Sequence, residues 1–208
     1  EALVDSIVEV DQRRNLMVHN RGKVNKLYLS RVCPGLVNSY NSKEGQSLDV
    51  TDTYLTHAID DVLLAGLLLV QHAWRKWEKD TISEADSGLI ATAFESLTDG
   101  RNDLVVRIAE LCESIPFASD ENKKIVTINR AIALRDLGRT TDMLALIDSV
   151  DWSSSAPRFK LAVAALKDDE AEFFRLLPKA VSADDLTRHE LETWPLFKPV
   201  REKDGFWK

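Results

Sequence analysis

The sequence has few of the residues that cross-link or interrupt a chain. Its 208 residues include 2 Cys, 8 Gly and 6 Pro, with 29% charged and 44% hydrophobic residues. Cys33 and Cys112 lie far apart and form no C-x-x-C or Cys/His spacing, which argues against a disulfide framework and a zinc site. This composition is typical of a globular, helix-rich chain. Two free thiols favour a reducing compartment, so we predict a cytoplasmic location.

Signals for export or membrane insertion are also missing. No basic start leads into an apolar segment with a small-residue cleavage site. The longest apolar run, Val62–Val70 (VLLAGLLLV), is bracketed by Asp60, Asp61 and Gln71. It is much shorter than the roughly 20 residues that a membrane span needs. We therefore expect a buried helix in a soluble protein and no membrane partner.

Common catalytic and metal-binding motifs are absent as well. The chain has no Gly-rich phosphate loop, no G-x-S-x-G and no H-E-x-x-H. His57 and His72 are fifteen residues apart, which is not a metal-ligand spacing. We interpret Asp60 and Asp61 as a helix-surface pair rather than a metal site. No metal and no cofactor are expected.

Negative charge is missing from one long segment. Gln12–Lys43 contains seven Lys and Arg and no Asp or Glu, so it carries about +7 while the remainder carries about −14. The net charge of −7 argues against nonspecific coating of nucleic acid. The segment itself offers one local surface that suits a polyanion.

Hydrophobic periodicity predicts an all-α protein. Over Glu1–Asn20, an apolar stripe at helical spacing is formed by Leu3, Ile7, Val10 and Met17. Arg14 and Asn15 fall on apolar seams of this helix, where a polar group must be paired or line a groove. Asn20-Arg21-Gly22 breaks the helix.

Further helices are expected along the whole chain. A short one covers Asn25–Val32 and ends at Pro34-Gly35, a loop with at most a short extended piece covers Asn38–Val50, and a long helix runs from Thr51 or Asp52 to about Lys79. Its expected core positions are Leu55, Ile59, Leu63, Val70 and Trp74. Shorter helices follow at Ser83–Leu97, Asn102–Ser114, Asp120–Leu137, Thr141–Asp148, Ala156–Leu166, Asp169–Ala180 and Asp184–Trp194. We predict a helical bundle over residues 1–80 and a domain of helical hairpins over residues 81–208.

Two resemblances accompany this reading. Arg14-Asn15-Leu16-Met17-Val18-His19 resembles the Arg-polar-x-x-x-His motif of the HEPN superfamily, and the wider run RRNLMVHNRGKVNKLYL is similar to bacterial HEPN domains. The resemblance implies a dimerising all-α bundle that acts as a metal-independent endoribonuclease in toxin–antitoxin, antiphage defence or RNA-processing systems, although some members lack catalysis. Asn129–Arg139 (NRAIALRDLGR) resembles the first helix of a tetratricopeptide repeat, without a regular 34-residue period.

The residues of the motif suit RNA cleavage. RNA carries its own nucleophile, the 2′-OH, so catalysis needs a proton-transfer group, here His19, and a cation for the phosphorane charge, here Arg14. Asn15 could orient the ring or hold a phosphate oxygen. Arg14 and His19 lie about 140° apart on an ideal helix. We therefore expect two copies of the chain to form one composite cleft.

Structural roles are the alternative for each of these residues. Arg14 could pair with Asp11 or a later carboxylate, Asn15 could make a helix-terminal hydrogen bond, and His19 could cap the helix end, where a cation is favoured. The remaining cations of the segment are interpreted as RNA phosphate contacts rather than catalysts. They are Arg13, Arg21, Lys23 and Lys26.

The prediction is therefore a homodimeric endoribonuclease that needs no metal and leaves a 2′,3′-cyclic phosphate. RNA is the expected ligand. Acidic helix starts at Asp168-Asp169-Glu170 and Asp184-Asp185 suggest that the C-terminal hairpins select a protein partner or antitoxin. The alternative for the hairpins is pure structural support of the bundle. The alternative is a catalytically silent HEPN dimerisation module joined to a helical-repeat protein-binding domain.

Overall fold

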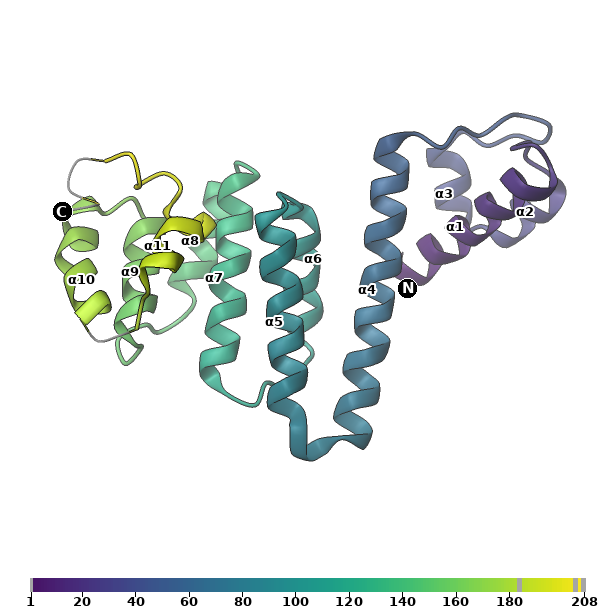
Figure 1. Cartoon of the computed structure of the whole chain (residues 1–208). Helices are drawn as coiled ribbons and strands as arrows, with labels where there is room; N and C mark the ends of the chain where they lie inside the picture. Colours follow the sequence, from purple (N-terminus) through teal and green to yellow (C-terminus); the bar gives the residue numbers. More distant parts are fainter. Residues whose placement is uncertain (1, 183–184, 204–205, 207–208) are drawn as a thin grey trace. The chain divides into compact units, whose positions relative to one another are not determined.

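The computed structural model describes residues 2–182, 185–203 and 206, and these residues form helices joined by turns (Figure 1). The predicted all-α fold is confirmed. One isolated bridge between Lys23 and Ser47 is the extended pairing in the described chain. The α-helices are α1 (Ala2–His19), α2 (Lys26–Arg31), α3 (Pro34–Ser39), α4 (Asp52–Trp77), α5 (Ile82–Thr98), α6 (Asn102–Cys112), α7 (Asp120–Asp136), α8 (Thr140–Asp148), α9 (Pro157–Leu166), α10 (Glu170–Ser182) and α11 (Arg188–Thr193). Short 3-10 turns lie at Lys79–Thr81 (η1) and Pro195–Phe197 (η2).

The chain divides into two compact units, residues 1–73 and 74–208. The division falls inside α4 rather than at the predicted boundary after residue 80. Its position follows from the side chains at the end of this helix. The Trp74 indole donates a hydrogen bond to Thr81 Oγ1 over 2.8 Å, and Arg75 donates to the main-chain oxygen of Pro116 over 2.7 Å. Both residues therefore belong to the second unit.

The first unit turns sharply after α1. Arg21 and Gly22 both have positive φ, 52° and 73°, and a Cβ at residue 22 would lie 3.1 Å from Met17 Sδ, so the turn favours glycine there. The main chain then runs beside Ser47. Asn25 caps α2 by accepting the Tyr28 N–H over 2.9 Å. The helix break and the second helix are thus confirmed, whereas α3 was not predicted.

The buried face of α1 differs from the predicted one. Its buried residues are Glu9, Gln12, Arg13 and Leu16. The predicted stripe of Leu3, Ile7, Val10 and Met17 is only half-buried, and Val4 and Val18 are exposed. The prediction was wrong because it assumed that apolar residues mark the inner face. In this helix a paired acid and base occupy that face instead.

The buried face of the long helix α4 also differs from the predicted one. Thr51 Oγ1 accepts the Tyr54 N–H over 3.1 Å, which confirms the expected N-terminal cap. Of the predicted core positions, Leu55, Ile59 and Val70 are exposed, while Asp60 and Asp61, expected on the surface, are buried. The inner face holds polar side chains, so the most apolar positions are turned outward.

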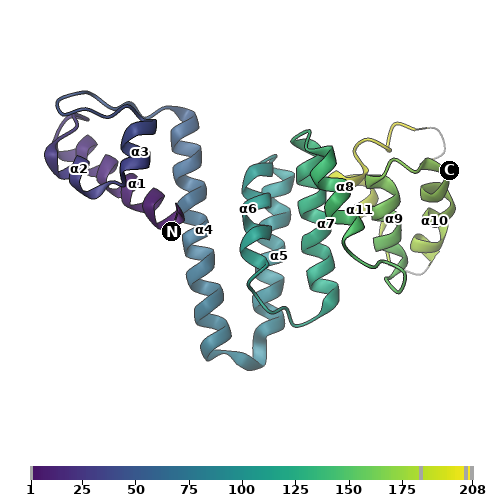
Figure 2. The same cartoon turned by 180° about the vertical axis from the view of Figure 1, so that it is seen from behind.

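The second unit consists of helical hairpins (Figures 1 and 2). α5 packs on α6 and α7, α7 packs on α8 and α9, and α9 packs on α10. Every helix from α5 to α10 agrees with its predicted range to within two residues at each end. The start predicted for the last helix, Asp184, lies outside the described residues. A continuous apolar core runs through this unit and includes Ile132, Ile147, Leu161, Phe173 and Phe197.

A buried carboxylate fixes the first turns of this unit. The Asp86 side chain is 0% exposed and forms an ion pair with Arg75. It also accepts the Ala118 N–H over 2.7 Å and the Asn122 side-chain amide over 3.0 Å. Asp86 thereby ties α5 to the loop before α7, and this satisfies a charge that would otherwise be costly to bury.

Candidate functional site

The motif residues lie at the C-terminal end of α1, on its outward side. Arg14 and His19 are exposed and Asn15 is half-buried. The Arg14 guanidinium donates to Asn15 Oδ1 over 3.1 Å, and the Asn15 amide donates to Asp11 Oδ2 over 3.2 Å. The chain Asp11–Asn15–Arg14 orients the guanidinium along the helix surface. Arg14 thus reaches Asp11 through Asn15 rather than by the direct ion pair considered as its alternative role.

His19 is the last residue of α1, directly before the turn at Arg21 and Gly22. This position fits two roles. A cationic imidazole there is favoured by the helix dipole, and an exposed imidazole is also accessible to a ligand that needs proton transfer. The backbone carbonyl of Leu16 is already used by the N–H groups of Asn20 and Gly22, over 2.8 and 3.0 Å. The helix end is therefore capped by the main chain without the His19 ring.

Three of the predicted phosphate contacts surround this helix end. Arg21, Lys23 and Lys26 are all exposed, and they lie in the turn after α1 and at the start of α2. The main chain at Lys23 is fixed by its bridge to Ser47. The positive charge predicted from the sequence is thus available at the surface within seven residues of His19 in the chain.

Arg13, the fourth predicted phosphate contact, is buried, and that prediction was wrong. Its side chain is 4% exposed, and its Nε lies 2.7 Å from Oε1 of Glu9, whose side chain is 2% exposed. The guanidinium also donates to the Asp49 main-chain oxygen over 3.1 Å. It lies over the rings of Tyr40 and Tyr54, 4.2 and 3.9 Å from their centroids. Arg13 holds α1 against α3 and α4 rather than facing solvent.

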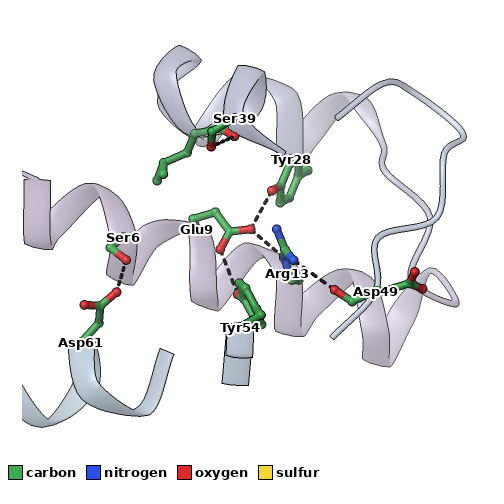
Figure 3. A network of polar contacts seen from close by, with 9 residues as sticks. Ser6, Glu9, Arg13, Tyr28, Ser39, Asp49, Tyr54 and Asp61 are labelled. Atoms are coloured by element: carbon green, nitrogen blue, oxygen red, sulfur yellow. Dashed lines mark hydrogen bonds and ion pairs between the residues drawn. The ribbon is translucent and has the colours of Figure 1, made fainter. Parts of the chain in front are cut away.

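Glu9 is the centre of this polar network (Figure 3). Its Oε1 accepts the Tyr28 hydroxyl over 2.7 Å, and its Oε2 accepts the Tyr54 hydroxyl over 2.8 Å. α1, α2 and α4 therefore meet at one carboxylate. A separate hydrogen bond from Ser6 to Asp61 joins α1 to α4 nearby (Figure 3).

Burial changes the acidity of the groups around Glu9. It raises the pKa of Tyr28 to about 12, with a further contribution from the hydrogen bond to Glu9. The pKa of Tyr54 is raised as well, first by burial and then by the Glu9 charge. Burial alone lowers the pKa of Arg13, but Glu9 and the tyrosines more than compensate, so this pKa lies above its usual value. The network is therefore one ion pair with protonated tyrosines.

A cavity of about 270 Å³ lies beside the network. Its lining includes Ser6, Tyr54, His57 and Asp61. None of Arg14, Asn15 and His19 lines it. The motif residues and this cavity are therefore separate features, and any chemistry at His19 takes place on an open surface unless another chain covers it.

The first unit exposes many large apolar side chains. Ten of the thirteen exposed large hydrophobic residues in the described chain belong to it. Five lie on α4, and Val18 lies between Arg14 and His19 in α1. Exposed apolar side chains are thus concentrated in the first unit. The set is Val4, Val18, Leu27, Tyr40, Val50, Leu55, Ile59, Val62, Leu69 and Val70.

Sequence reasoning missed the Glu9–Arg13 network. The available signal was the spacing of four between Glu9 and Arg13, which places an acid and a base on one face of a helix. The comparisons with known proteins add no assignment, since no protein-family model, curated protein or solved structure matches this chain.

Proposed function

We propose that the protein is a metal-independent endoribonuclease with Arg14, Asn15 and His19 as its catalytic residues. The observation that supports this most directly is the exposure of Arg14 and His19 at the end of α1, beside a turn that carries exposed cations. The resemblance of residues 14–19 to the HEPN motif points the same way.

In this proposal the RNA supplies the nucleophile. The His19 imidazole takes the proton from the 2′-OH, water protonates the leaving 5′ oxygen, and Arg14 stabilises the negative charge of the phosphorane. Asn15 positions the Arg14 guanidinium through the hydrogen bond described above. The products are a 2′,3′-cyclic phosphate and a 5′-hydroxyl. Arg21, Lys23 and Lys26 bind neighbouring phosphates.

The active form in this proposal is a homodimer. Arg14 and His19 point about 140° apart on one helix, so a second copy must supply the missing group at each cleft. The exposed face of α4 supports such a pairing. Leu55, Ile59, Val62, Gly66 and Leu69 follow a spacing of four and three residues, which is the seam of a paired helix. At Gly66 a Cβ would meet no atom within 4 Å, so a neighbouring backbone could approach closely.

A membrane is the competing partner for α4. The helix is long and apolar enough to cross a bilayer by length and composition, and only 17% of its most apolar stretch is buried. However, its inner face carries buried Asp60, Asp61 and Gln71. Carboxylates are costly in hydrocarbon. No exposed residue from Thr53 to His72 is Asp, Glu, Lys or Arg, so over this stretch the helix lacks the charged polar face that is typical of an interfacial helix. A second protein chain fits this helix better.

An interaction module without catalysis is the second candidate. It is favoured by the hydrogen bonds from Arg14 to Asn15 and from Asn15 to Asp11, which give both side chains a structural role. Its dimer would be the same, with a protein partner or antitoxin bound by the hairpins. Both candidates place the protein in the cytoplasm, where Cys33 and Cys112 stay reduced. Cleavage of RNA in EDTA by wild type and His19→Ala separates them.

A further inference from the structure

The turn between α1 and α2 runs beside a loop that is distant in the sequence. Lys23 and Ser47 form an antiparallel bridge, and the Val24 N–H donates to the Gln46 main-chain oxygen over 2.8 Å. The loop before α4 therefore passes along this turn (Figure 1). Val24 is 1% exposed, and neighbouring residues of an extended segment point to opposite sides. The Lys23 side chain accordingly faces solvent.

This pairing brings Lys43 to the start of α2. The Gly45 N–H donates to the Val24 oxygen over 2.8 Å, and the Gln46 N–H donates to the Lys43 oxygen over 3.0 Å, which closes a tight turn. Two residues of chain span at most about 7 Å, so Lys43 lies close to the Val24 carbonyl, two residues before Lys26. The Lys43 N–H also donates to Oε1 of Gln46 over 3.2 Å, which fixes its main chain.

The cations at this pairing are all exposed, and we call them the basic edge. In the described part of the chain, none of them forms an ion pair. In the second unit, by contrast, Arg130 pairs with both Glu110 and Glu113. Glu44, in the turn after Lys43, is the acid of the pairing and is exposed too. The surface is therefore net positive and not neutralised from within. The basic edge consists of Arg21, Lys23, Lys26 and Lys43.

The arrangement of these charges suits an extended polyanion. The basic edge does not line the cavity beside Glu9. Its lysines are point charges on flexible stems along an open surface, which can follow successive phosphates. An anionic membrane fits less well, because α2 has six residues and exposes one large apolar side chain, Leu27, so there is little apolar area to insert.

We propose that the basic edge binds the phosphate backbone of an RNA strand and that Lys43, from the loop before α4, is one of its phosphate contacts. The inference rests on the proposed function, because His19 ends the helix that leads directly into the basic edge and is the group that cuts the bound strand. The carboxylate of Glu44 opposes this binding by its charge.

Binding is measured apart from cleavage with a short fluorescent RNA whose 2′-OH groups are methylated, because this strand lacks the nucleophile. Fluorescence anisotropy with the full chain gives the affinity at several salt concentrations. For a single strand, the slope of log affinity against log salt is about −0.7 for each neutralised phosphate. Lys43→Ala should therefore bind more weakly, with a slope shallower by about 0.7. Lys43→Arg should keep the wild-type slope, and Glu44→Gln should bind more tightly.

Lys123→Ala is the matched control. Lys123 is an exposed lysine of α7 and forms no ion pair within the described residues, so its loss should leave affinity and slope unchanged. Circular dichroism verifies that each variant is folded. Wild-type affinity and slope in Lys43→Ala, an equal loss in Lys123→Ala, or binding to anionic vesicles but not to the strand would overturn the proposal. Binding as expected without cleavage of unmodified RNA would support the basic edge and overturn only the catalytic proposal.

Discussion

Arg13 and Glu9 form an ion pair in the interior of the first unit, with the guanidinium Nε 2.7 Å from the carboxylate. The pair decides which side of α1 faces inward. Because Arg13 points into the unit, the next residue, Arg14, is turned by about 100° and lies on the surface. The buried arginine thus gives the exposed one its position beside the end of the helix.

Loss of the Glu9 charge should unfold the first unit readily. Glu9→Gln leaves Arg13 buried without its counter-ion, and breaking such a pair costs about 3–5 kcal/mol. The apolar core beside it is small, with Leu16, Val24 and Tyr28 among its five buried residues. Chemical denaturation followed by circular dichroism measures the change.

The matched control is Glu192→Gln, which removes the partner of exposed Arg188 on α11. An exposed pair contributes less than about 1 kcal/mol. If Glu9→Gln and Glu192→Gln lose the same small amount of stability, the Glu9 network does not hold the first unit together.

Stability should fall at alkaline pH through the buried tyrosines. The pKa of Tyr28 is raised from 10.0 to about 12, so between these values the unfolded chain has lost a proton that the folded chain still binds. The free energy of unfolding therefore decreases as pH rises through this range. Urea titrations at several pH values should show a smaller decrease in Tyr28→Phe. An identical pH dependence in the two proteins would argue against a protonated, buried Tyr28.

The helices were predictable because residues that disfavour helix, mainly Gly and Pro, lie at their ends. Gly138 follows α7, Pro116 precedes it, and Asn20-Arg21-Gly22 breaks the chain after α1, so element boundaries could be placed closely. The short α3 was missed because Pro34 and Gly35, which ended the preceding helix as predicted, also begin a new one. Proline is well tolerated in a first helical turn.

The faces of α1 and α4 were not predictable from hydrophobicity. In both helices the inner face carries acids, namely Glu9 in α1 and Asp60 and Asp61 in α4. Glu9 and Asp61 also accept hydrogen bonds from side chains that are distant in the sequence. Tyr54, for example, donates to a carboxylate 45 residues earlier. Periodicity cannot reveal such pairing. Hydrophobicity also cannot show that Arg13 is buried while Arg14 is exposed. The one signal in the sequence is Glu9, which lies four residues before Arg13.

The outward face of α4 should control the oligomeric state. Val62 is 54% exposed and lies in the middle of the apolar row of α4 that we propose as the dimer contact. In a symmetric dimer, Val62→Arg brings one new positive charge from each chain into this contact. We expect light scattering to give a dimer for wild type and a monomer for this variant. Val181→Arg, at a 46% exposed position on α10, should leave the dimer intact.

Two results would contradict this pairing. The first is a wild-type protein that stays monomeric at micromolar concentration. The second is flotation of wild type, but not of Val62→Arg, with neutral phosphatidylcholine vesicles. That second outcome would identify a bilayer as the partner of α4.

The two thiols should react at very different rates. Cys112 is buried, and burial raises its pKa to about 12, whereas Cys33 is half-buried. Since the thiolate is the reactive form, Cys33 should be modified by a disulfide reagent in the folded protein and Cys112 only after unfolding. The Cys33→Ser variant isolates the second thiol. Rapid modification of Cys112 in that folded variant would show that α6 opens easily.

A mixing experiment tests the composite cleft. Arg14→Ala and His19→Ala should each be inactive alone, but equal amounts exchanged into mixed dimers should recover about a quarter of wild-type cleavage, because half of the dimers keep one complete cleft. The assay is RNA cleavage after subunit exchange. If both single variants are inactive and the mixture stays inactive after confirmed exchange, Arg14 and His19 act within one chain.

The most direct measurement is cleavage of a mixed RNA pool in EDTA by the verified dimer and by His19→Ala and Lys23→Ala. Wild type should produce ends with 2′,3′-cyclic phosphate. His19→Ala should be slower by about 10²–10⁴-fold with unchanged folding and RNA affinity, whereas Lys23→Ala should mainly weaken binding and lower its salt dependence. Equal cleavage by wild type and His19→Ala, or no cleavage by the wild-type dimer freed of any partner, would contradict the ribonuclease proposal and favour an interaction module.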